Sequence, residues 1–332
     1  MPRERRFSGF PWRAVVTALW MLVTLVGVAL LCCAVAEVGP SWVSAVGSVT
    51  VATSYSAALA LRTGGRPVIY GLLALAIGIA AVGSDTDVLR NGAAVLTAVV
   101  SAVFAVAATV PAVRFVTAVR EVLVAGFIAA GGALAVVGLE PQVALERFEY
   151  TSLAGALLLA LLLVYRLGAG LHGLGRRGLL IVAVGGLVLA STLAYAEALR
   201  RYGSPDLVAT LDDAVAWTRT NLGAVPRPLQ VLLGTPALLW GCHMRARRRQ
   251  GWWVCAFGVA GTVSIAAGLM HPRLGLVESA LTVAYGVGLG LVLGYLVIRV
   301  DLALTGPRGA PGRRAEEASA LRPEPRRTAP LL

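Results

Sequence analysis

The stretch Arg227–Trp253, RPLQVLLGTPALLWGCHMRARRRQGWW, decides how the chain folds. Its apolar part, centred on Leu229–Cys242, has a length that predicts a helix across a lipid bilayer, and Pro236 lies near its middle. Four arginines follow, and basic clusters of this kind stay on the cytoplasmic side of a membrane. They are Arg245, Arg247, Arg248 and Arg249. The stretch therefore predicts a membrane span and the side on which it ends.

The rest of the chain has the same apolar character. Of its 332 residues, 58% are hydrophobic and 14% are charged, whereas about 25% of the residues of a soluble domain are charged. Lipid is thus the expected surroundings of most of the chain. A net charge of +12 would point to nucleic acid in a soluble protein, but in a membrane protein positive cytoplasmic loops explain it, so no nucleic-acid partner is predicted.

Ten apolar runs predict an all-α, polytopic bundle of about ten transmembrane helices within residues 14–299. The predicted spans are residues 14–36, 41–62, 67–84, 92–113, 117–139, 151–168, 179–199, 227–244, 251–270 and 275–299. Residues 1–13 form a short cytoplasmic segment before them. Residues 300–332 are rich in Pro, Gly, Ala and charge, which predicts a disordered cytoplasmic tail.

The distribution of arginine supports this number of spans, because one missed helix would reverse the polarity of every later loop. With the N-terminus inside, most of the 29 basic residues, all of them arginines, fall on the cytoplasmic side. Arginine without lysine is typical of a GC-rich bacterial genome. We therefore predict a bacterial plasma membrane location with both termini cytoplasmic, and anionic lipid headgroups as partners of the arginine-rich segments.

One loop on the outer side is long enough to hold a helix of its own. Ser204 can cap it and Pro205 can occupy its first position, with apolar residues at helical spacing up to Leu222. An amphipathic helix over residues 204–222, lying on the outer surface, is predicted. A lid over a substrate vestibule is the alternative.

Signatures of soluble enzymes are absent from the sequence, which contains no HExxH, no GxxxxGK[ST] and no GxSxG. The four cysteines contain no CxxC spacing. We therefore predict no catalytic residue, no metal site and no cofactor. A lipid-modifying enzyme is a third interpretation, and it would need Glu278 and His271 to converge on one pocket.

Polar residues inside the predicted spans are the remaining candidates for function, because a charge at membrane depth is costly and usually marks a site or a pairing. Glu278, Thr282 and Tyr285 fall at i, i+4 and i+7, on one face of the tenth span. We predict that they line a substrate or ion pathway. The alternative is a glutamate near the outer interface, satisfied by Arg273 or water.

The second span carries another polar stripe, in which Ser44, Ser48 and Tyr55 share one helical face that ends at Arg62. Such a stripe can line a polar path. The alternative is that serine hydroxyls bond neighbouring helices or their own backbone.

Two further features concern helix geometry. Gly286, Gly290 and Gly294 form overlapping GxxxG steps, which predict close packing of another helix on the tenth span. Pro236 removes a backbone hydrogen bond near the middle of the eighth span, so it predicts a kink there and is a candidate hinge.

Ten spans also divide into five plus five, and an odd-numbered repeat would insert its second copy upside down. Arg66-Pro67 opens the third span as Arg227-Pro228 opens the eighth, and Glu121 follows Arg114 by seven residues as Glu278 follows His271. Glu121 is therefore a second candidate pathway residue. This layout resembles the drug/metabolite transporter superfamily, which implies ten helices in two inverted halves. The resemblance covers the hydropathy plan and carries no site residues, and the long loop after the seventh span differs from the short loops of that family.

The leading hypothesis is a small-molecule transporter or permease driven by an ion gradient, with the small molecule unidentified. The alternative is a non-catalytic membrane subunit or scaffold, which would dock a protein partner or anionic lipid through its arginine-rich loops.

Overall fold

The computed structural model describes residues 12–84, 86–169, 171–247, 251–271, 274–305 and 324–331. Within these ranges the chain is helical and has no β-strand, so the predicted all-α bundle is confirmed. The elements are α1 (Trp12–Val35), α2 (Trp42–Arg62), α3 (Pro67–Gly83), α4 (Asp87–Ala107), α5 (Phe115–Val137), α6 (Leu145–Val164), η1 (Tyr165–Ala169), α7 (Leu171–Tyr202), α8 (Pro205–Leu222), η2 (Gln230–Gly234), α9 (Thr235–Arg245), α10 (Gly251–Phe257), α11 (Val259–Leu269) and α12 (Leu276–Thr305).

Eight helical segments of the described chain are long and apolar enough to cross a bilayer. They are Ala14–Val35, Trp42–Arg62, Asp87–Ala107, Phe115–Val137, Leu145–Leu167, Gly178–Leu199, Gly251–Leu269 and Leu276–Leu304. These segments make the chain an integral, multi-pass membrane protein. The predicted third and eighth spans correspond to α3 and to η2 with α9, which are shorter but lie within the bundle against α2 and α12. Ten spans therefore remains a prediction.

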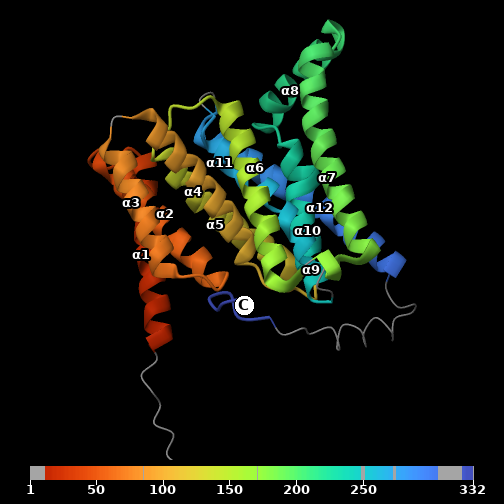
Figure 1. The fold of residues 1–332 in the computed structure, drawn as a ribbon. Coiled ribbons are helices and arrows are strands. Elements are labelled where there is room, and N and C mark those ends of the chain that lie inside the picture. Colours follow the sequence, from red (N-terminus) through yellow and green to blue (C-terminus); the bar gives the residue numbers. More distant parts are fainter. Residues whose placement is uncertain are drawn as a thin grey trace, which may run out of the picture.

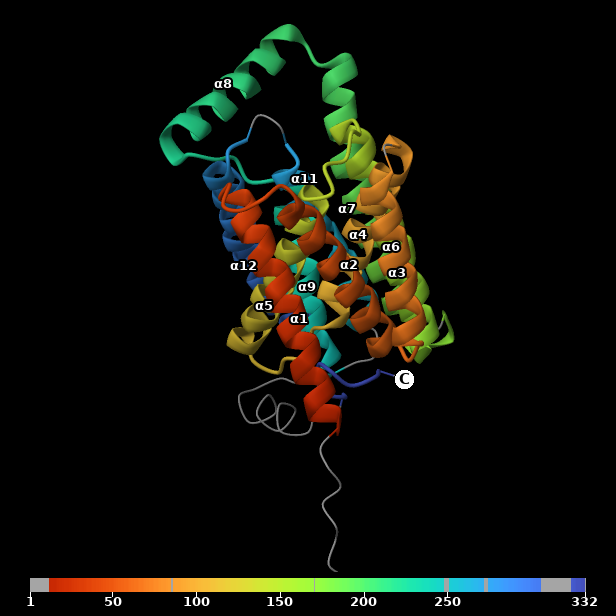
Figure 2. The ribbon, with the colours of Figure 1, turned by 90° about the vertical axis from the view of Figure 1, so that its left-hand side faces the viewer.

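The long helices lie side by side, and the chain reverses direction from one to the next (Figure 1). α1 begins at the same end of the bundle as the segment 324–331, and we call this the basic end (Figures 1 and 2). α8 crosses the other end, the α8 end (Figure 2). α11, α4 and α5 contact the largest number of other elements, whereas α1 and α7 lie at the outside. Alanine dominates the buried residues, which lets the helices approach closely.

The helix predicted over residues 204–222 is present as α8. The Ser204 hydroxyl accepts a hydrogen bond from the backbone N–H of Leu207 at 3.3 Å, and Pro205 is the first helical residue. α8 ends where Gly223 adopts a φ of 79°, a left-handed conformation that glycine tolerates best. None of the residues of α8 is buried, so this helix lies on the bundle and outside its core.

The regular α-helical hydrogen bonding of the predicted eighth span is interrupted in its first half by a π-turn, although the chain stays helical from Pro228 to Arg245. η2 is a π-helical turn, in which the Thr235 N–H donates to the Gln230 carbonyl, and Pro236 follows as the second residue of α9. In a regular helix the Pro236 ring would clash with the carbonyl four residues earlier, and the wider turn removes that conflict. The sequence predicted a kink at Pro236, and the structure has a π-turn directly before this residue, running into α9.

The predicted ninth span is also interrupted. α10 ends at Phe257 and α11 begins at Val259, and the Gly258 N–H donates to the Cys255 carbonyl at 2.8 Å, which tightens the turn between them. The two interrupted helices are in contact at Gly234 and Gly261. A methyl group on Gly234 would overlap the backbone of Gly261. Only glycine permits this approach.

Helix contacts differ between the two predicted halves. α2 packs against α1, α3, α4 and α5, whereas α7, its counterpart in a five-plus-five repeat, has its main contacts with α10, η1 and η2. An inverted repeat requires matching contacts. The predicted repeat is thus not confirmed.

The C-terminal region departs from the expected disordered tail at two places. α12 continues to Thr305, and residues 324–331 lie against the basic end of the bundle (Figure 1). The residues between them, 306–323, lie outside the described part of the chain. Composition predicts disorder from a low apolar content, but residues 324–331 are placed by hydrogen bonds and ion pairs, which composition does not register.

Candidate functional site

The polar stripe of α2 is used in helix packing. The Ser44 hydroxyl donates to the Gly138 carbonyl at 3.0 Å, and Ser48 is buried against the same glycine. Tyr55 is buried with its ring 5.2 Å from that of Phe104, measured between centroids. These three side chains therefore contact α4 and the end of α5. Only the Ser44 hydroxyl forms the predicted bond to a neighbouring helix, and the buried Ser48 hydroxyl has no hydrogen-bond partner within the described residues.

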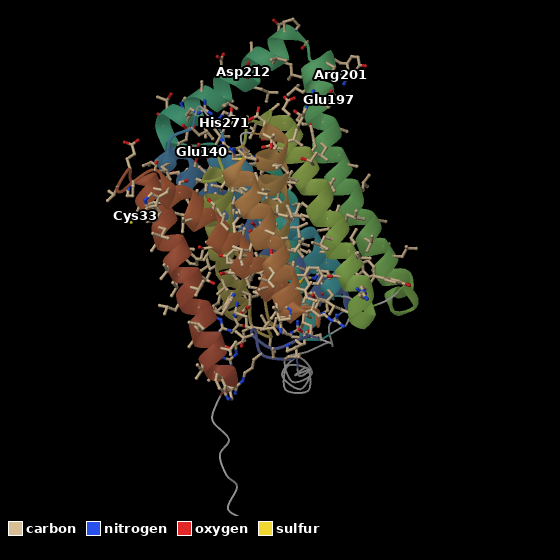
Figure 3. The ribbon with its side chains drawn as sticks, turned by 60° about the vertical axis from the view of Figure 1, so that its left-hand side comes forward. Cys33, Glu140, Glu197, Arg201, Asp212 and His271 are labelled. Atoms are coloured by element: carbon tan, nitrogen blue, oxygen red, sulfur yellow. The ribbon has the colours of Figure 1, made fainter. Side chains whose placement is uncertain are left out.

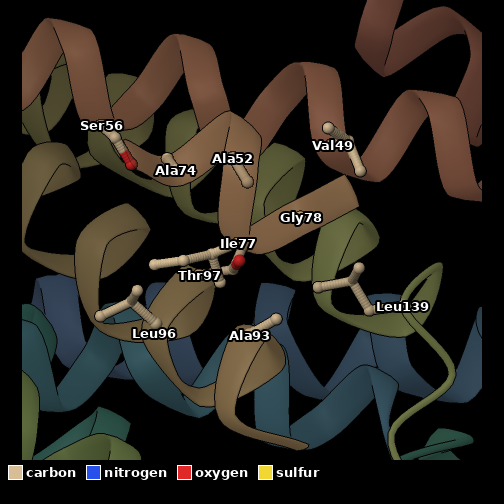
Figure 4. A pocket seen from close by; sticks show the side chains of 10 residues that line it. All are labelled: Val49, Ala52, Ser56, Ala74, Ile77, Gly78, Ala93, Leu96, Thr97 and Leu139. Atoms are coloured by element: carbon tan, nitrogen blue, oxygen red, sulfur yellow. The ribbon is translucent and has the colours of Figure 1, made fainter. Parts of the chain in front are cut away.

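A hollow between α2, α3 and α4 has an apolar lining (Figure 4). Its residues are Val49, Ala52, Ser56, Ala74, Ile77, Gly78, Ala93, Leu96, Thr97 and Leu139. Ser56 and Thr97 supply its two hydroxyl groups, and none of the predicted pathway residues belongs to it. This hollow therefore suits an apolar group better than an ion.

The stripe predicted on the tenth span ties α12 to α8. Glu278 accepts from Arg219 at 2.7 Å, and the Tyr285 hydroxyl donates to the Leu222 carbonyl at 2.8 Å. Thr282, between them, is buried. Arg273, the partner considered from sequence, lies outside the described residues. The sequence offered no signal for Arg219, because the position of α8 over α12 is a tertiary feature.

Other charged groups gather at the α8 end (Figure 3). Glu149 of α6 pairs with Arg227, just before η2, at 2.5 Å, and Glu197 pairs with Arg201 along α7 at 2.5 Å. Figure 3 places Asp212 and His271 at this end as well. Glu149, Glu197 and Asp212 thus lie at the same end of the bundle as Glu278.

The glycine stripe of α12 packs on the interrupted helix η2–α9. Gly286 faces the Gln230 side chain, Gly290 faces Thr235, and Gly294 faces Leu239 and Pro236. Gln230 is buried, and its side-chain carbonyl has no hydrogen-bond partner within the described chain. Small residues on one helix therefore bring α12 onto the π-turn and the proline that follows it.

The buried charged side chains of the described chain, Arg62, Glu121 and Arg245, lie at the basic end. We call Arg62, Thr109, Glu121 and Arg245 the tail site, and residues 324–331, which bind it, the tail segment. The tail site draws on α2, the connection between α4 and α5, α5 itself, and α9. Elements far apart in sequence therefore build one charged cluster.

Arg245, the last residue of α9, is 1% exposed. Its Nη1 donates to the Thr109 hydroxyl at 2.7 Å and its Nη2 to the Thr109 carbonyl at 3.2 Å. Nη2 also pairs with the Glu324 carboxylate at 2.5 Å, and the guanidinium lies 3.5 Å from the centroid of the Trp252 ring. A charge-assisted hydrogen bond and an aromatic face both stabilise a buried cation.

Arg62, the last residue of α2, is 2% exposed. Its Nε donates to the Ala107 carbonyl at 2.9 Å. Its Nη1 donates to the carbonyls of Arg326 and Ala329 at 2.9 and 2.6 Å. The Leu331 N–H returns a hydrogen bond to the Arg62 carbonyl at 2.8 Å. Arg62 therefore fixes the backbone of the tail segment.

Glu121, a predicted pathway residue on α5, is fully buried. One of its oxygens accepts from the Val110 N–H at 3.0 Å, and its carboxylate pairs with Arg327 at 2.9 Å and with Arg120 at 3.0 Å. Removing a partner from such a group is costly, since a lone buried charge loses its water without compensation. Glu121 thus binds the tail segment, and it lines no described cavity.

The arginine cluster after α9 divides between two environments. Arg245 is in the tail site, whereas Arg247 contacts the His243 ring through its guanidinium. Arg248 and Arg249 lie outside the described residues. Sequence reasoning assigned Arg62 and Arg245 to membrane orientation and missed their binding role. The sequence contained no specific signal for this role, because Glu324 and Arg327 are two of many charges in a tail rich in Pro, Gly, Ala and charge.

The fold and the charged ends together define a class, an integral multi-pass membrane protein with a helical bundle. Comparison of the chain with protein-family models, with curated proteins and with solved structures finds no match. The hydropathy plan resembles that of the drug/metabolite transporter superfamily, but no match in sequence or fold supports this resemblance.

Proposed function

We propose that the chain is a small-molecule permease driven by an ion gradient, in which η2–α9 moves against α11. The observation that carries this proposal is the meeting of two interrupted helices inside the bundle, with Gly234 against Gly261. Interrupted helices in protein interiors are a recurring feature of secondary transporters, where freed backbone groups bind substrate or ion. Pro236 is the hinge in this proposal.

Buried polar groups beside the interruption are candidates for contact with the substrate. Gln230 and Thr235 are buried at the π-turn, and Thr262 is buried on α11. Of these, Gln230 has a side-chain oxygen without a partner within the described residues. A polar group of the substrate would satisfy it, because buried acceptors are normally paired.

Glu278 is the proposed coupling carboxylate, with Thr282 and Tyr285 as its neighbours. Its pairing with Arg219 holds α8 on α12, and the Glu278 side chain is 21% exposed, so protons from the α8 side can reach it. Protonation would remove the ion pair and release α8. In this proposal the α8 end faces the outside of a bacterial plasma membrane, and the basic end faces the cytoplasm.

Reconstituted vesicles test this function. Vesicles loaded with the pH dye pyranine are given amino acids, sugars, nucleosides or quaternary amines one at a time, under an imposed proton gradient. We expect one class to cause proton flux that Glu278→Gln reduces at least tenfold. Glu140→Gln, which changes an exposed glutamate at the same end, is the matched control. Flux that Glu278→Gln leaves unchanged would refute the coupling role, and absence of flux with every class would refute the permease.

A membrane scaffold is the second candidate, and the tail site favours it. This site holds a peptide segment through charged groups, so the same end of the bundle is chemically suited to dock a partner. Purification after gentle solubilisation separates the two functions. A stoichiometric protein partner supports the scaffold, and a stable monomer with proton-coupled flux supports the permease.

A further inference from the structure

We propose that the tail site is a binding site for a peptide that carries a carboxylate and, three residues later, a guanidinium, and that the tail segment is its resident ligand. Glu324 binds Arg245, and Arg327 binds Glu121. Glu324 and Arg327 thus each meet an opposite, buried charge of the bundle. A peptide with the two charges exchanged would place like charges together.

Groups of the bundle outside the tail segment hold the charged side chains of the tail site in place. Arg62 is held by the Ala107 carbonyl, Arg245 by both oxygens of Thr109, and Glu121 by the Val110 N–H. Each of the three charged groups also forms a hydrogen bond or an ion pair with the tail segment. Preorganised groups of this kind bind with a smaller loss of side-chain entropy, which is typical of a built binding site.

The backbone of the tail segment is recognised in addition to its charges. Arg62 donates to two of its carbonyls, and the Arg62 carbonyl accepts from Leu331, near the end of the chain. The contacts extend from Glu324 to Leu331. Side-chain charge fixes the register of the peptide, and the main-chain bonds hold the residues that follow.

The bound tail segment bridges parts of the bundle that the proposed function would move. Arg62, Thr109 and Glu121 belong to the first five predicted spans, whereas Arg245 ends α9, the arm beyond the Pro236 hinge. On the proposed function, the tail segment restrains α9 against α5 and must leave before the basic end opens. This consequence rests on the permease proposal, but the binding of the tail segment does not.

Mobility of a spin label measures this binding directly. The label is placed at Thr328→Cys, an exposed position in the tail segment, in a full-length chain with Cys32→Ser and Cys33→Ser, which removes the two exposed cysteines. We expect a strongly immobilised spectrum. A mobile label in the otherwise unchanged chain would overturn the proposal.

Two neighbouring arginines supply a matched pair of variants. Arg327→Gln removes the ion pair with Glu121 and should make at least half of the labels mobile. Arg326→Gln makes the same chemical change at an exposed side chain, whose contact with Arg62 uses only the main-chain carbonyl. It should leave the label immobile. Equal mobility in the two variants would contradict recognition by charge.

Competition in trans tests the ligand class without any change to the bundle. A synthetic peptide with the sequence of residues 321–332 should displace the tail segment and mobilise the label, and the same peptide with Gln at positions 324 and 327 should not. Displacement by both peptides, or by neither, would refute the binding site. Immobilisation and displacement without proton flux would uphold this inference and reject the permease, whereas flux with a mobile label would do the reverse.

Discussion

A guanidinium stays charged inside a helix bundle, so its burial is costly unless hydrogen-bond acceptors or an aromatic face surround it. Arg245 is surrounded by Thr109, Glu324 and the Trp252 ring. Arg62 obtains its acceptors from backbone carbonyls. The stability of the fold therefore depends on the tail site. Removing one of its charged side chains leaves the opposite charge buried without a partner.

Arg245→Gln should lower the free energy of unfolding by about 3 kcal/mol, in the range found when one partner of a buried ion pair is removed. Thermal unfolding in detergent measures the change as a lower Tm. Arg66→Gln is the control, because Arg66 is an exposed arginine at the N-terminus of α3, at the same end of the bundle. Equal losses of stability in the two variants would show that Arg245 is not a buried partner.

At the residue scale, the sequence showed which polar side chains lie within the predicted spans, but it did not predict the residues with which they pair. Glu278 was predicted because a carboxylate at membrane depth is costly, and Glu121 because the proposed repeat makes it the counterpart of Glu278. Both are in ion pairs. Their partners, Arg327 and Arg219, lie far along the chain or on a separate helix. Periodicity reports the face of one helix and carries no information on which helix meets that face.

At the element scale, the contact of α12 with η2–α9 depends on glycine. Gly286, Gly290 and Gly294 recur every fourth residue and face the π-turn and the residues after Pro236. The sequence predicted this stripe and an irregular helix at Pro236, since both follow from local covalent chemistry. It did not predict the break at Gly258, because a single glycine in an apolar run is compatible with a continuous helix.

Gly290→Ala tests this packing. A Cβ at position 290 would lie 2.5 Å from the Thr235 Cβ, so α12 must shift, and we expect a loss of about 1 to 3 kcal/mol in the free energy of unfolding. Gly288→Ala is the matched control, because no atom lies within 4 Å of a Cβ placed there. Unfolding in denaturant measures both. A Gly290→Ala chain as stable as the Gly288→Ala chain would contradict the packing of α12 on η2–α9.

At the scale of the whole molecule, the two ends differ in charge and in what covers them. The tail segment lies on the basic end, and α8 lies across the other (Figure 2). Composition predicted the membrane bundle and arginine predicted its orientation, because insertion energetics act on the whole chain. The five-plus-five repeat was not confirmed, since similar hydropathy in two halves does not require similar helix contacts.

The central claim is that the chain crosses a membrane with its basic end on the cytoplasmic side and α8 on the other. A membrane-impermeant maleimide added to intact cells tests it, with one cysteine at Asp212→Cys on α8 or at Thr328→Cys in the tail segment, and with Cys32→Ser and Cys33→Ser in both chains. We expect labelling of position 212 in intact cells and of position 328 only after permeabilisation. Labelling of position 328 from outside, or protection of position 212, would contradict it.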